Sequence, residues 1–580
     1  MENTINYKNK EYSTEFLTQN HLVITFLKQK MFKKKLALCI GAGFSFPFGL
    51  PSWKDLVKSI SEHEQVNGKT VYENNVLSLT TKIQVLFETY RKNYLDSKRD
   101  NESEFIEDEI RRNWIKIVQE CLYKKYHDLD ESDRSKKDIY FDEFIEIIKE
   151  SPVTVNYNFD DVIERELQNK REDQEERNYE TTSRPFMQFK REKCVIYHPN
   201  GFIPKSDRNG VEGNFVFSEK SFQDQLIDTM SGRYSPLQYL FLNYTMLLTG
   251  ISLDDPTLRH ILRKNATLNP GHFHVFIYYD KEKGLSEKDK LAIQESYFET
   301  FNLITLFFNG EDIKQLAQYI ALSEKDYNIL INKTRLFRSF KFYLSGSPGT
   351  GKTTSLDYLA DFVIKDEFLA PTKEELLQQD TNLKDKERVE TDVWVTEQFR
   401  LRNSIIFDED KNCCIQLIDR SPIDPLGFVD DKKEDALLKR AKELKDNYYS
   451  RGASMVNGKI IVLEAKANTI FTRLNKRNPR EKPEDYAYQM DYINKTIKNF
   501  NSIFPSRSYK HIDSESSKAK LAKDIAHEIF FGRYTETDFK TILSDIIQRE
   551  GRKQGLSPVQ IVNLLDEAQS YSNVISDLTK

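Results

Sequence analysis

The chain has 580 residues, enough for roughly two to four domains. Its 86 Lys and Arg residues against 91 Asp and Glu give a formal net charge of −5, which argues against a protein that binds polyanions over a broad surface. The 38 Phe and 29 Tyr residues supply large side chains for buried cores, so we expect a folded protein. No apolar run predicts a membrane span and the first residues do not resemble a signal peptide, so we expect a cytoplasmic location.

The cysteines give no sign of a metal or disulfide framework. Five are present, at Cys39, Cys121, Cys194, Cys413 and Cys414. No two of them form a C-x-x-C pair, the spacing that many structural zinc sites use. The sequence therefore predicts neither a disulfide framework nor a four-cysteine zinc site.

The first half has the pattern of a parallel sheet covered by helices. An apolar run at residues 35–40 ends in a glycine turn, as a buried parallel strand does. Further strands are predicted at the apolar runs 152–155, 194–197, 214–217, 244–248, 274–279 and 303–308. Because helical patterns separate most of these runs, we expect a doubly wound, Rossmann-type α/β fold.

Two stretches of the first half depart from this rhythm. Charged helical patterning over residues 71–126 predicts a helical insertion, which we place at about residues 60–150. The polar stretch 168–184 is predicted to be a loop or the solvated end of a helix.

The second half repeats the alternation of strands and helices. Strands are predicted near residue 342 and at 414–418, 459–464 and 509–512, with a charged insertion at 430–451. After about residue 535 the pattern becomes helical, and Ser557 and Pro558 are typical of a helix N-cap and first helical residue. We therefore predict a first domain at 1–325, a second α/β domain at 326–535 and a helical C-terminal tail at 536–580.

Four motifs of the first half follow predicted strands. They are GAGFS at 41–45 continuing to GLP at 49–51, NFDD at 158–161 with Glu164, HPNG at 198–201, and GIS at 250–252 with Asp255. A glycine turn between a strand and a helix lets backbone N–H groups approach a diphosphate. In these four motifs and in their order, the first half resembles the sirtuin superfamily. The phrases GLPSW, NFDDVIE, SEKSF and ISLDDPTLRHIL resemble its NAD-hydrolysing anti-phage defence branch rather than the deacylases, which usually carry a four-cysteine zinc module.

This resemblance implies a role for each matching residue. Asn158 would orient the nicotinamide ribose and the attacking water, Asp160 would contact the nicotinamide side, and His198 would be the general base toward the ribose hydroxyls. These residue types suit the reaction, because breaking the C1′–N bond develops positive charge on the ribose. The remaining cofactor-binding residues implied by the resemblance are Gly41, Ala42, Gly43 and Ser45 at the diphosphate, and Ser252 and Asp255 on the other side of NAD.

The third motif departs from the family pattern. The family usually places histidine immediately before the glycine, whereas Asn200 precedes Gly201 here and His198 stands two positions earlier. Residues two apart on a strand share a face, so His198 could serve in a slightly different register. Alternatively, the histidine function is missing and Asn200 only binds the cofactor.

The second half opens with a complete phosphate-loop motif. It comprises Gly346, Gly349, Gly351, Lys352 and Thr353, follows an apolar strand and opens a helix. In such loops backbone N–H groups hold the phosphates of ATP or another NTP, the lysine reaches the β and γ oxygens, and the hydroxyl binds Mg²⁺.

The rest of the second half resembles thymidylate and deoxynucleoside kinases. Asp419 and Arg420 end a predicted strand as the strand-end acid and arginine of such kinases do, and Asp419 would be a second Mg²⁺ ligand. Arginine suits bidentate contacts with phosphate. By this resemblance Gln398, Arg400 and Arg402 would lie near an acceptor, and Arg473, Arg477 and Arg480 would form a lid. No catalytic base is identified from the sequence.

Three functions remain open from the sequence. The first is a bacterial anti-phage effector that hydrolyses NAD to ADP-ribose and nicotinamide, controlled by nucleotide binding to the kinase-like domain, by a phage-derived trigger or by homo-oligomer formation. The second is a nucleotide kinase with a non-catalytic NAD or ADP-ribose module. The third is an NTP-driven assembly scaffold. No membrane partner is expected, and direct nucleic-acid binding is not favoured because no basic stripe with aromatic residues is present.

Overall fold

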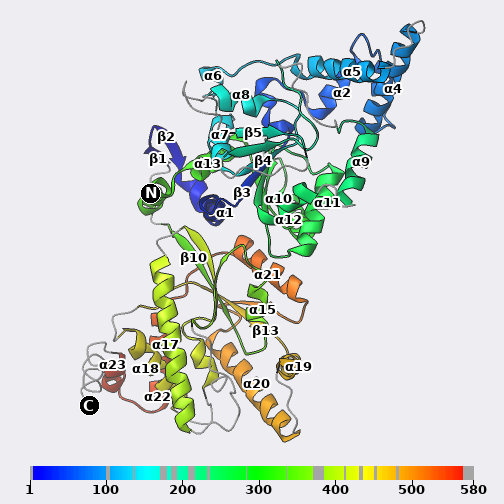
Figure 1. Cartoon of the computed structure of the whole chain (residues 1–580). Helices are drawn as coiled ribbons and strands as arrows, with labels where there is room; N and C mark the ends of the chain where they lie inside the picture. The colour runs from blue at the N-terminus through cyan, green and yellow to red at the C-terminus, as the bar shows by residue number, and fades with distance from the viewer. Residues whose placement is uncertain are drawn as a thin grey trace. The chain divides into compact units, whose positions relative to one another are not determined.

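The computed structural model describes residues 4–98, 105–134, 136, 139–169, 179–184, 193–206, 216–230, 235–281, 284–334, 336–369, 385–409, 413–429, 435–449, 454–477 and 483–565. The chain divides into two compact units, Met1–Leu330 and Ile331–Lys580 (Figure 1). Each unit is an α/β structure with its own parallel sheet. Among the described helices, none is both long enough and apolar enough to cross a membrane.

The first unit is built around seven parallel strands. They are β3 (Leu36–Ile40), β4 (Val153–Asn156), β5 (Tyr179–Thr182), β6 (Cys194–Tyr197), β7 (Thr245–Thr249), β8 (His274–Tyr279) and β9 (Leu303–Phe308). Their order across the sheet is β5-β6-β4-β3-β7-β8-β9. The chain thus starts in the middle at β3 and winds outward in both directions. The winding reverses beside β3, and ligands of such sheets bind at the carboxyl ends next to this reversal.

The helices and short elements of the first unit connect these strands. In chain order they are the hairpin β1 (Thr4–Tyr7) and β2 (Lys10–Ser13), α1 (Thr14–Phe32), the short 3₁₀ turns η1 (Ala42–Phe44) and η2 (Phe46–Phe48), α2 (Trp53–Ser61), α3 (Lys69–Glu73), α4 (Leu79–Ser97), α5 (Ile106–Tyr123), α6 (Glu131–Arg134), α7 (Phe141–Glu150), α8 (Val162–Asn169), α9 (Glu219–Met230), α10 (Ser235–Asn243), α11 (Pro256–Leu268), α12 (Glu287–Phe301), α13 (Gly310–Ala321) and α14 (Glu324–Thr334).

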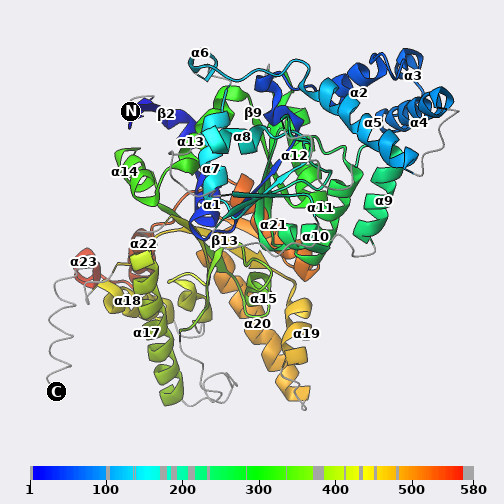
Figure 2. The same cartoon turned by 45° about the horizontal axis from the view of Figure 1, so that its top comes forward.

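The core of the first unit lies on the sheet. Alternate residues of the central strands, such as Cys39, Val155 and Leu248, are buried in one apolar cluster with side chains from α10 and α11. α1 packs against α13, and α13 packs against α7. Helices α2 to α5 form an arm on one side of the sheet (Figure 2), in the region where the helical insertion was predicted.

The second unit has a five-stranded parallel sheet. Its strands are β10 (Ser339–Ser345), β11 (Val363–Lys365), β12 (Cys414–Asp419), β13 (Lys459–Glu464) and β14 (Lys510–Asp513), in the order β11-β12-β10-β13-β14. Its helices are α15 (Lys352–Leu356), α17 (Asp385–Glu409), the 3₁₀ helix η3 (Asp424–Phe428), α18 (Ala436–Tyr449), α19 (Ala467–Arg477), α20 (Pro483–Ile503), α21 (Lys518–Phe531), α22 (Phe539–Lys553) and α23 (Pro558–Leu565). Strand β10, which precedes the phosphate loop, is central, so the loop opens at the middle of the sheet.

The structure corrects three local predictions. The stretch 168–184 contains strand β5, because Tyr179 and Thr182 turn inward at the sheet edge although their neighbours are polar. The stretch 430–451 is not a surface insertion: α18 within it buries Leu444 and Tyr448 in the core. Of the run 214–217, only Val216 and Phe217 are described and neither is in a strand.

The C-terminal helical prediction has a more specific form in the structure. Phe539, Leu543 and Ile547 of α22 belong to the core of the second unit, where α22 packs against α18. Helix α23 begins at Pro558, and Ser557 Oγ accepts a hydrogen bond from Gln560 N–H at 3.3 Å, as expected for an N-cap. Residues 566–580 lie outside the described part of the chain.

Candidate functional site

Three buried polar side chains meet at the carboxyl edge of the first sheet. Asn158 follows β4, and its Nδ2 donates to Gly41 O at 3.0 Å and to Ser45 Oγ at 3.2 Å. The Ser45 hydroxyl in turn donates to Asp160 Oδ1 at 3.2 Å. The structure therefore brings together Ser45 of the GAGFS motif with Asn158 and Asp160 of the NFDD motif. All three are at least 93% buried.

His198 contacts the main chain of this cluster and is fully buried. Its Nδ1 is 2.8 Å from Asn158 O, and because a carbonyl only accepts, Nδ1 carries the hydrogen. Its Nε2 is 2.9 Å from Glu164 Oε1, which also accepts from Thr181 Oγ1 at 3.0 Å. Burial alone lowers the pKa of His198, but the Glu164 carboxylate reverses this and the net pKa is raised. The geometry thus favours an imidazolium held between two acceptors.

The carboxyl group of Asp160 has a pKa close to neutral pH. Burial raises its pKa to about 7, against an opposing hydrogen bond from the Val162 N–H. The neighbouring Glu164 carboxylate also raises the pKa, whereas His198 lowers it. A carboxyl group that changes charge near pH 7 can exchange a proton during a reaction.

The glycine loop is held against the end of β7. Gly41 N–H donates to Thr249 O at 3.1 Å and Gly43 N–H to Gly250 O at 2.9 Å. A Cβ at Gly41 would lie 2.6 Å from Gly250 O, and Gly250 itself has φ +64°. These glycines therefore allow two backbone segments to approach each other. The N–H groups of Gly41 and Gly43, expected at a diphosphate, are turned toward β7 in this structure.

The other predicted residues of the first unit lie around this cluster with different roles. Asn200 is buried, and its Oδ1 accepts from Gln225 Nε2 at 3.2 Å. Asp255 caps α11, where Oδ1 accepts from Leu258 N–H at 2.8 Å. Ser252 is exposed in the turn after β7, and Ala42 is half-buried in η1. Among these four residues, Asn200 is the one whose side chain bonds to another buried side chain, that of Gln225.

The phosphate loop of the second unit has the backbone geometry that its glycines allow. Gly346, Gly349 and Gly351 have φ of +134°, +79° and +96°, values that other residues rarely adopt. Lys352 Nζ folds back onto the loop and donates to Gly346 O at 2.8 Å and Ser347 O at 3.0 Å. Burial, together with the nearby positive charge of Arg420, lowers the pKa of Lys352 to about 8. The ammonium thus lies on the loop, the part of such motifs that holds phosphate oxygens.

The two residues that the sequence analysis expects at Mg²⁺, Thr353 and Asp419, contact each other next to Lys352. The Thr353 hydroxyl donates to Asp419 Oδ2 at 2.7 Å, and Asp419 Oδ1 is buried without a hydrogen-bond partner in the described chain. Hydroxyl and carboxylate oxygens are the ligands that Mg²⁺ prefers, with phosphates and water completing its shell. The residues therefore fit the ion. No group of three or more His, Cys, Asp or Glu that could hold a metal occurs within the described ranges.

Arg420 is the centre of a charged cluster next to the loop. Its backbone has φ +68°, a strained value for a residue other than glycine. Its Nε lies 2.6 Å from Glu367 Oε1, and its Nη1 lies 3.5 Å from Asp424 Oδ2 and donates to Gly346 O at 3.2 Å. Glu367, just after β11, is 29% exposed in its side chain. Glu367 has no signal in the sequence, because the strand before it, β11, has only three residues and no distinct apolar run.

The three residues expected near an acceptor have mainly other partners. Arg402 is buried and donates to four carbonyl oxygens, those of Asp366, Glu367, Asp419 and Arg420. It thereby joins the ends of β11 and β12 rather than facing a ligand. Arg400 pairs with Glu397 on α17, and Gln398 Oε1 accepts from Leu369 N–H at 3.2 Å.

The predicted lid arginines are placed unequally. Arg473 Nη1 donates to Gly349 O at 3.3 Å and its Nη2 to Ser514 O at 2.6 Å, so it lies against the phosphate loop. Arg477 is exposed on α19. Arg480 lies outside the described residues.

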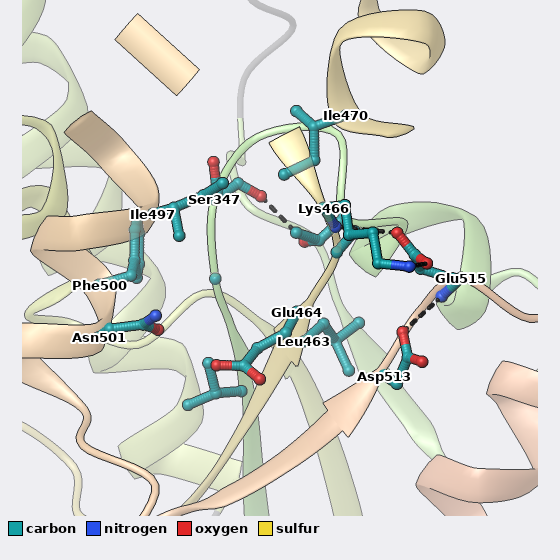
Figure 3. Close-up of a pocket in the computed structure, with 14 residues that line it drawn as sticks. Ser347, Leu463, Glu464, Lys466, Ile470, Ile497, Phe500, Asn501, Asp513 and Glu515 are labelled. Carbon is teal, nitrogen blue, oxygen red and sulfur yellow. Dashed lines mark hydrogen bonds and ion pairs between the residues drawn. The ribbon is translucent and has the colours of Figure 1, made fainter. Parts of the chain in front are cut away.

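A pocket of about 350 Å³ adjoins the start of the phosphate loop (Figure 3). It is lined by Gly346 and Ser347, by the end of β13, and by side chains of α19 and α20. Apolar groups such as Ile470 and Phe500 form part of its wall, and Glu464, Asp513 and Glu515 give it acidic groups. This size and mixed lining suit a small organic ligand.

Comparison with known proteins relates one part of the chain to a family. Residues 152–303 match the family model of the SIR2-like domain, which indicates an NAD-related function for the first unit. No curated protein matches the chain. A solved structure, deoxyadenosine kinase from M. mycoides with the products dCMP and a flexible dCDP bound, is 17% identical and covers 33% of this chain and 98% of that chain, with a TM-score of 0.25. The α/β arrangement of the second unit is described by its own strand order and phosphate loop.

Proposed function

We propose that the first unit hydrolyses NAD to ADP-ribose and nicotinamide. The observation that carries this proposal is the buried cluster of Ser45, Asn158 and Asp160 at the reversal point of the sheet. The SIR2-like match over residues 152–303 supports NAD as the ligand. Asn158 and Ser45 offer hydrogen bonds to ribose hydroxyls once NAD replaces their mutual contact.

The reaction needs a group that takes up one proton. The C1′–N bond breaks, its electron pair leaves with neutral nicotinamide, and water adds to C1′ with loss of a proton. In our proposal the Asp160 carboxylate accepts that proton, since its pKa of about 7 suits a general base. Its negative charge also stabilises the positive ribose in the transition state.

The proposal gives His198 a role different from the one expected from the resemblance. Its Nδ1 donates to Asn158 O and its Nε2 faces Glu164, so neither nitrogen is available to a ribose hydroxyl. We assign His198 and Glu164 as positioning residues that fix the backbone of Asn158. Asn200, which stands directly before the glycine, serves cofactor binding in this scheme.

The second unit is proposed to bind an NTP with Mg²⁺ and to control NAD hydrolysis. Thr353 and Asp419 would hold Mg²⁺, which neutralises phosphate charge, and Lys352, Arg420 and Arg473 would bind phosphates. Unregulated NAD hydrolysis would kill the host cell, so a nucleotide switch suits an anti-phage effector whose trigger comes from the phage. A homo-oligomer that is inactive until triggered is one form of this control.

A nucleotide kinase is the second candidate function. It is favoured by Glu367, a partly exposed carboxylate beside Arg420 and the phosphate loop, because an acceptor hydroxyl needs a base at this place. In that case the first unit would only bind NAD or ADP-ribose.

The deciding experiment follows nicotinamide release from NAD by the full chain, with and without ATP-Mg²⁺ and a panel of deoxynucleotides. Asn158→Ala is expected to abolish release, and Lys352→Ala is expected to alter its nucleotide dependence. Asn243→Ala is the matched control, since in the described part of the chain that amide bonds within its own helix, to Tyr239 O of α10. Transfer of γ-phosphate to a nucleotide without nicotinamide release would replace the hydrolase by the kinase.

A further inference from the structure

The end of helix α5 contacts the loop that carries Asn158. Tyr123, the last residue of α5, is partly buried, and its hydroxyl lies 3.0 Å from Asp161 Oδ1 and 2.8 Å from Ile203 O. The same oxygen accepts from the Asp161 N–H at 3.1 Å. Because a phenol has one hydrogen, Asp161 Oδ1 and Ile203 O share it. Tyr123 therefore binds both the side chain and the backbone of Asp161.

A second residue of α5 binds the loop after β6. Gln119, one helical turn before Tyr123, donates from Nε2 to Pro204 O at 2.5 Å. The next residue, Lys205, donates its N–H to Asp161 Oδ2 at 2.9 Å. Thus one face of α5 joins the loop after β4 to the loop after β6.

A short series of hydrogen bonds connects these contacts to the backbone next to Asn158. Ile203 N–H donates to Phe159 O at 2.7 Å, so the loop held by Tyr123 also fixes the residue next to Asn158. On the other side, His198 Nδ1 holds Asn158 O. The backbone from Asn158 to Asp161 is therefore held at one end by His198 and at the other by Tyr123.

We infer that Tyr123 is a positioning residue for the Asn158–Asp161 loop, through which the helical arm α2–α5 sets the geometry of the NAD-cleaving cluster. The expected effect on catalysis rests on the proposed function. The positioning of the loop by Tyr123 rests on the hydrogen bonds alone. α5 also packs against α2 and α4, and the ring of Trp114 on α5 meets Phe87 of α4 edge-on and Tyr90 of α4 at a tilt. A displacement of the arm thus reaches Asn158 without any contact with NAD.

The test compares two matched substitutions at the same helix end. Tyr123→Phe removes the hydroxyl that bonds to Asp161 and Ile203, whereas Tyr126→Phe removes a hydroxyl whose partner within the described ranges is the exposed Asp128. We expect Tyr123→Phe to lower kcat for nicotinamide release about 10-fold with KM unchanged within about 2-fold, since a misplaced group costs rate rather than binding. Tyr126→Phe is expected to match the wild type.

Hydrogen exchange gives a readout that does not need activity. In Tyr123→Phe the Asp161 amide loses its acceptor, so exchange in peptides covering residues 158–163 and 203–206 is expected to rise about 10-fold, with peptides of β8 and β9 unchanged. Gln119→Ala should raise exchange in the 203–206 peptide. Asp161→Asn combined with Tyr123→Phe should lower kcat by less than the product of the two single effects.

The outcomes separate this inference from the proposed function. If the wild type releases no nicotinamide under any condition, NAD hydrolysis fails and exchange alone decides. Raised exchange at 158–163 then upholds the positioning role of Tyr123. Exchange and kcat in Tyr123→Phe equal to those of Tyr126→Phe would overturn it.

Discussion

His198 and Asn158 are joined by a hydrogen bond of 2.8 Å from the imidazole Nδ1 to the main-chain carbonyl. The bond fixes the backbone of the residue that the proposed reaction depends on, and it leaves the Asn158 amide free to turn toward Gly41 and Ser45. The other imidazole nitrogen faces Glu164. A buried ion pair between α8 and the residue that follows β6 thus supports the backbone of Asn158.

Glu164→Gln tests this support through stability. Removing one member of a buried ion pair leaves an uncompensated charge, so we expect a loss of about 3 kcal/mol in the free energy of unfolding. Denaturant titration measures the loss, with the exposed Glu62→Gln as a control expected to change little. A variant as stable as the wild type would show that His198 is not held as an imidazolium.

The same pair predicts how stability depends on pH. Because the pKa of folded His198 lies above its ordinary value, the pair's contribution is fully present below about pH 6.5 and is lost as pH rises through the folded pKa. Unfolding curves recorded from pH 6 to 9 should show this loss in the wild type. In His198→Gln the dependence above pH 7 should be smaller, and an unchanged dependence would assign it to other groups.

Asp160 predicts the pH profile of NAD cleavage. As a base it must be ionised, and with its pKa at about 7 in the free protein, kcat/KM is expected to rise through pH 7 and level off above pH 8. Asp160→Asn should lower kcat by about 100-fold or more and leave a flat profile. The reverse profile, with activity falling above pH 7, would mean that the protonated carboxyl is the active form.

Gly250 predicts a backbone requirement at the site. A Cβ there would lie 2.5 Å from Phe44 N, and φ is +64°, so Gly250→Ala must displace the loop of Gly41 to Ser45. We expect weaker NAD binding and a stability loss of about 1–2 kcal/mol. Gly284→Ala is the matched control, because its Cβ meets no atom within 4 Å. Equal NAD affinity in the two variants would show that the loop does not shape the NAD site.

The sequence predicted strands with a long apolar run better than short strands. β6, β8, β9 and β13 have the bounds predicted from their mostly apolar runs, and this includes β9 at the edge of the first sheet. The edge strands β5 and β11 were missed because each is short and lies among charged residues.

The sequence could predict those residues of the candidate site that belong to local motifs. Ser45, Asn158 and Asp160 each lie within a few residues of a predicted strand end, and parallel strands bring those ends together. The pairing of His198 with Glu164 and that of Tyr123 with Asp161 join residues 34 and 38 positions apart. Such contacts depend on how helices α8 and α5 pack, which no local pattern records.

Lys352 predicts that nucleotide binding is linked to proton uptake. Its pKa is lowered to about 8 in the free protein, and phosphate charges would return it toward its ordinary value near 10.5. Binding of ATP-Mg²⁺ at pH 8.5 should therefore take up a fraction of a proton, whereas at pH 6.5 Lys352 contributes almost none. Calorimetric titrations in two buffers of different ionisation enthalpy measure the uptake directly.

Two variants test whether Lys352 is the group that takes up this proton. Thr353→Ala weakens Mg²⁺ binding but keeps the ammonium, so the uptake at pH 8.5 is expected to persist in whatever binding remains. Lys352→Arg replaces the ammonium by a guanidinium that stays charged at this pH, and the uptake should disappear. Uptake of the same size in Lys352→Arg would place the titrating group elsewhere in the site. The depressed pKa of Lys352 would then not govern nucleotide affinity.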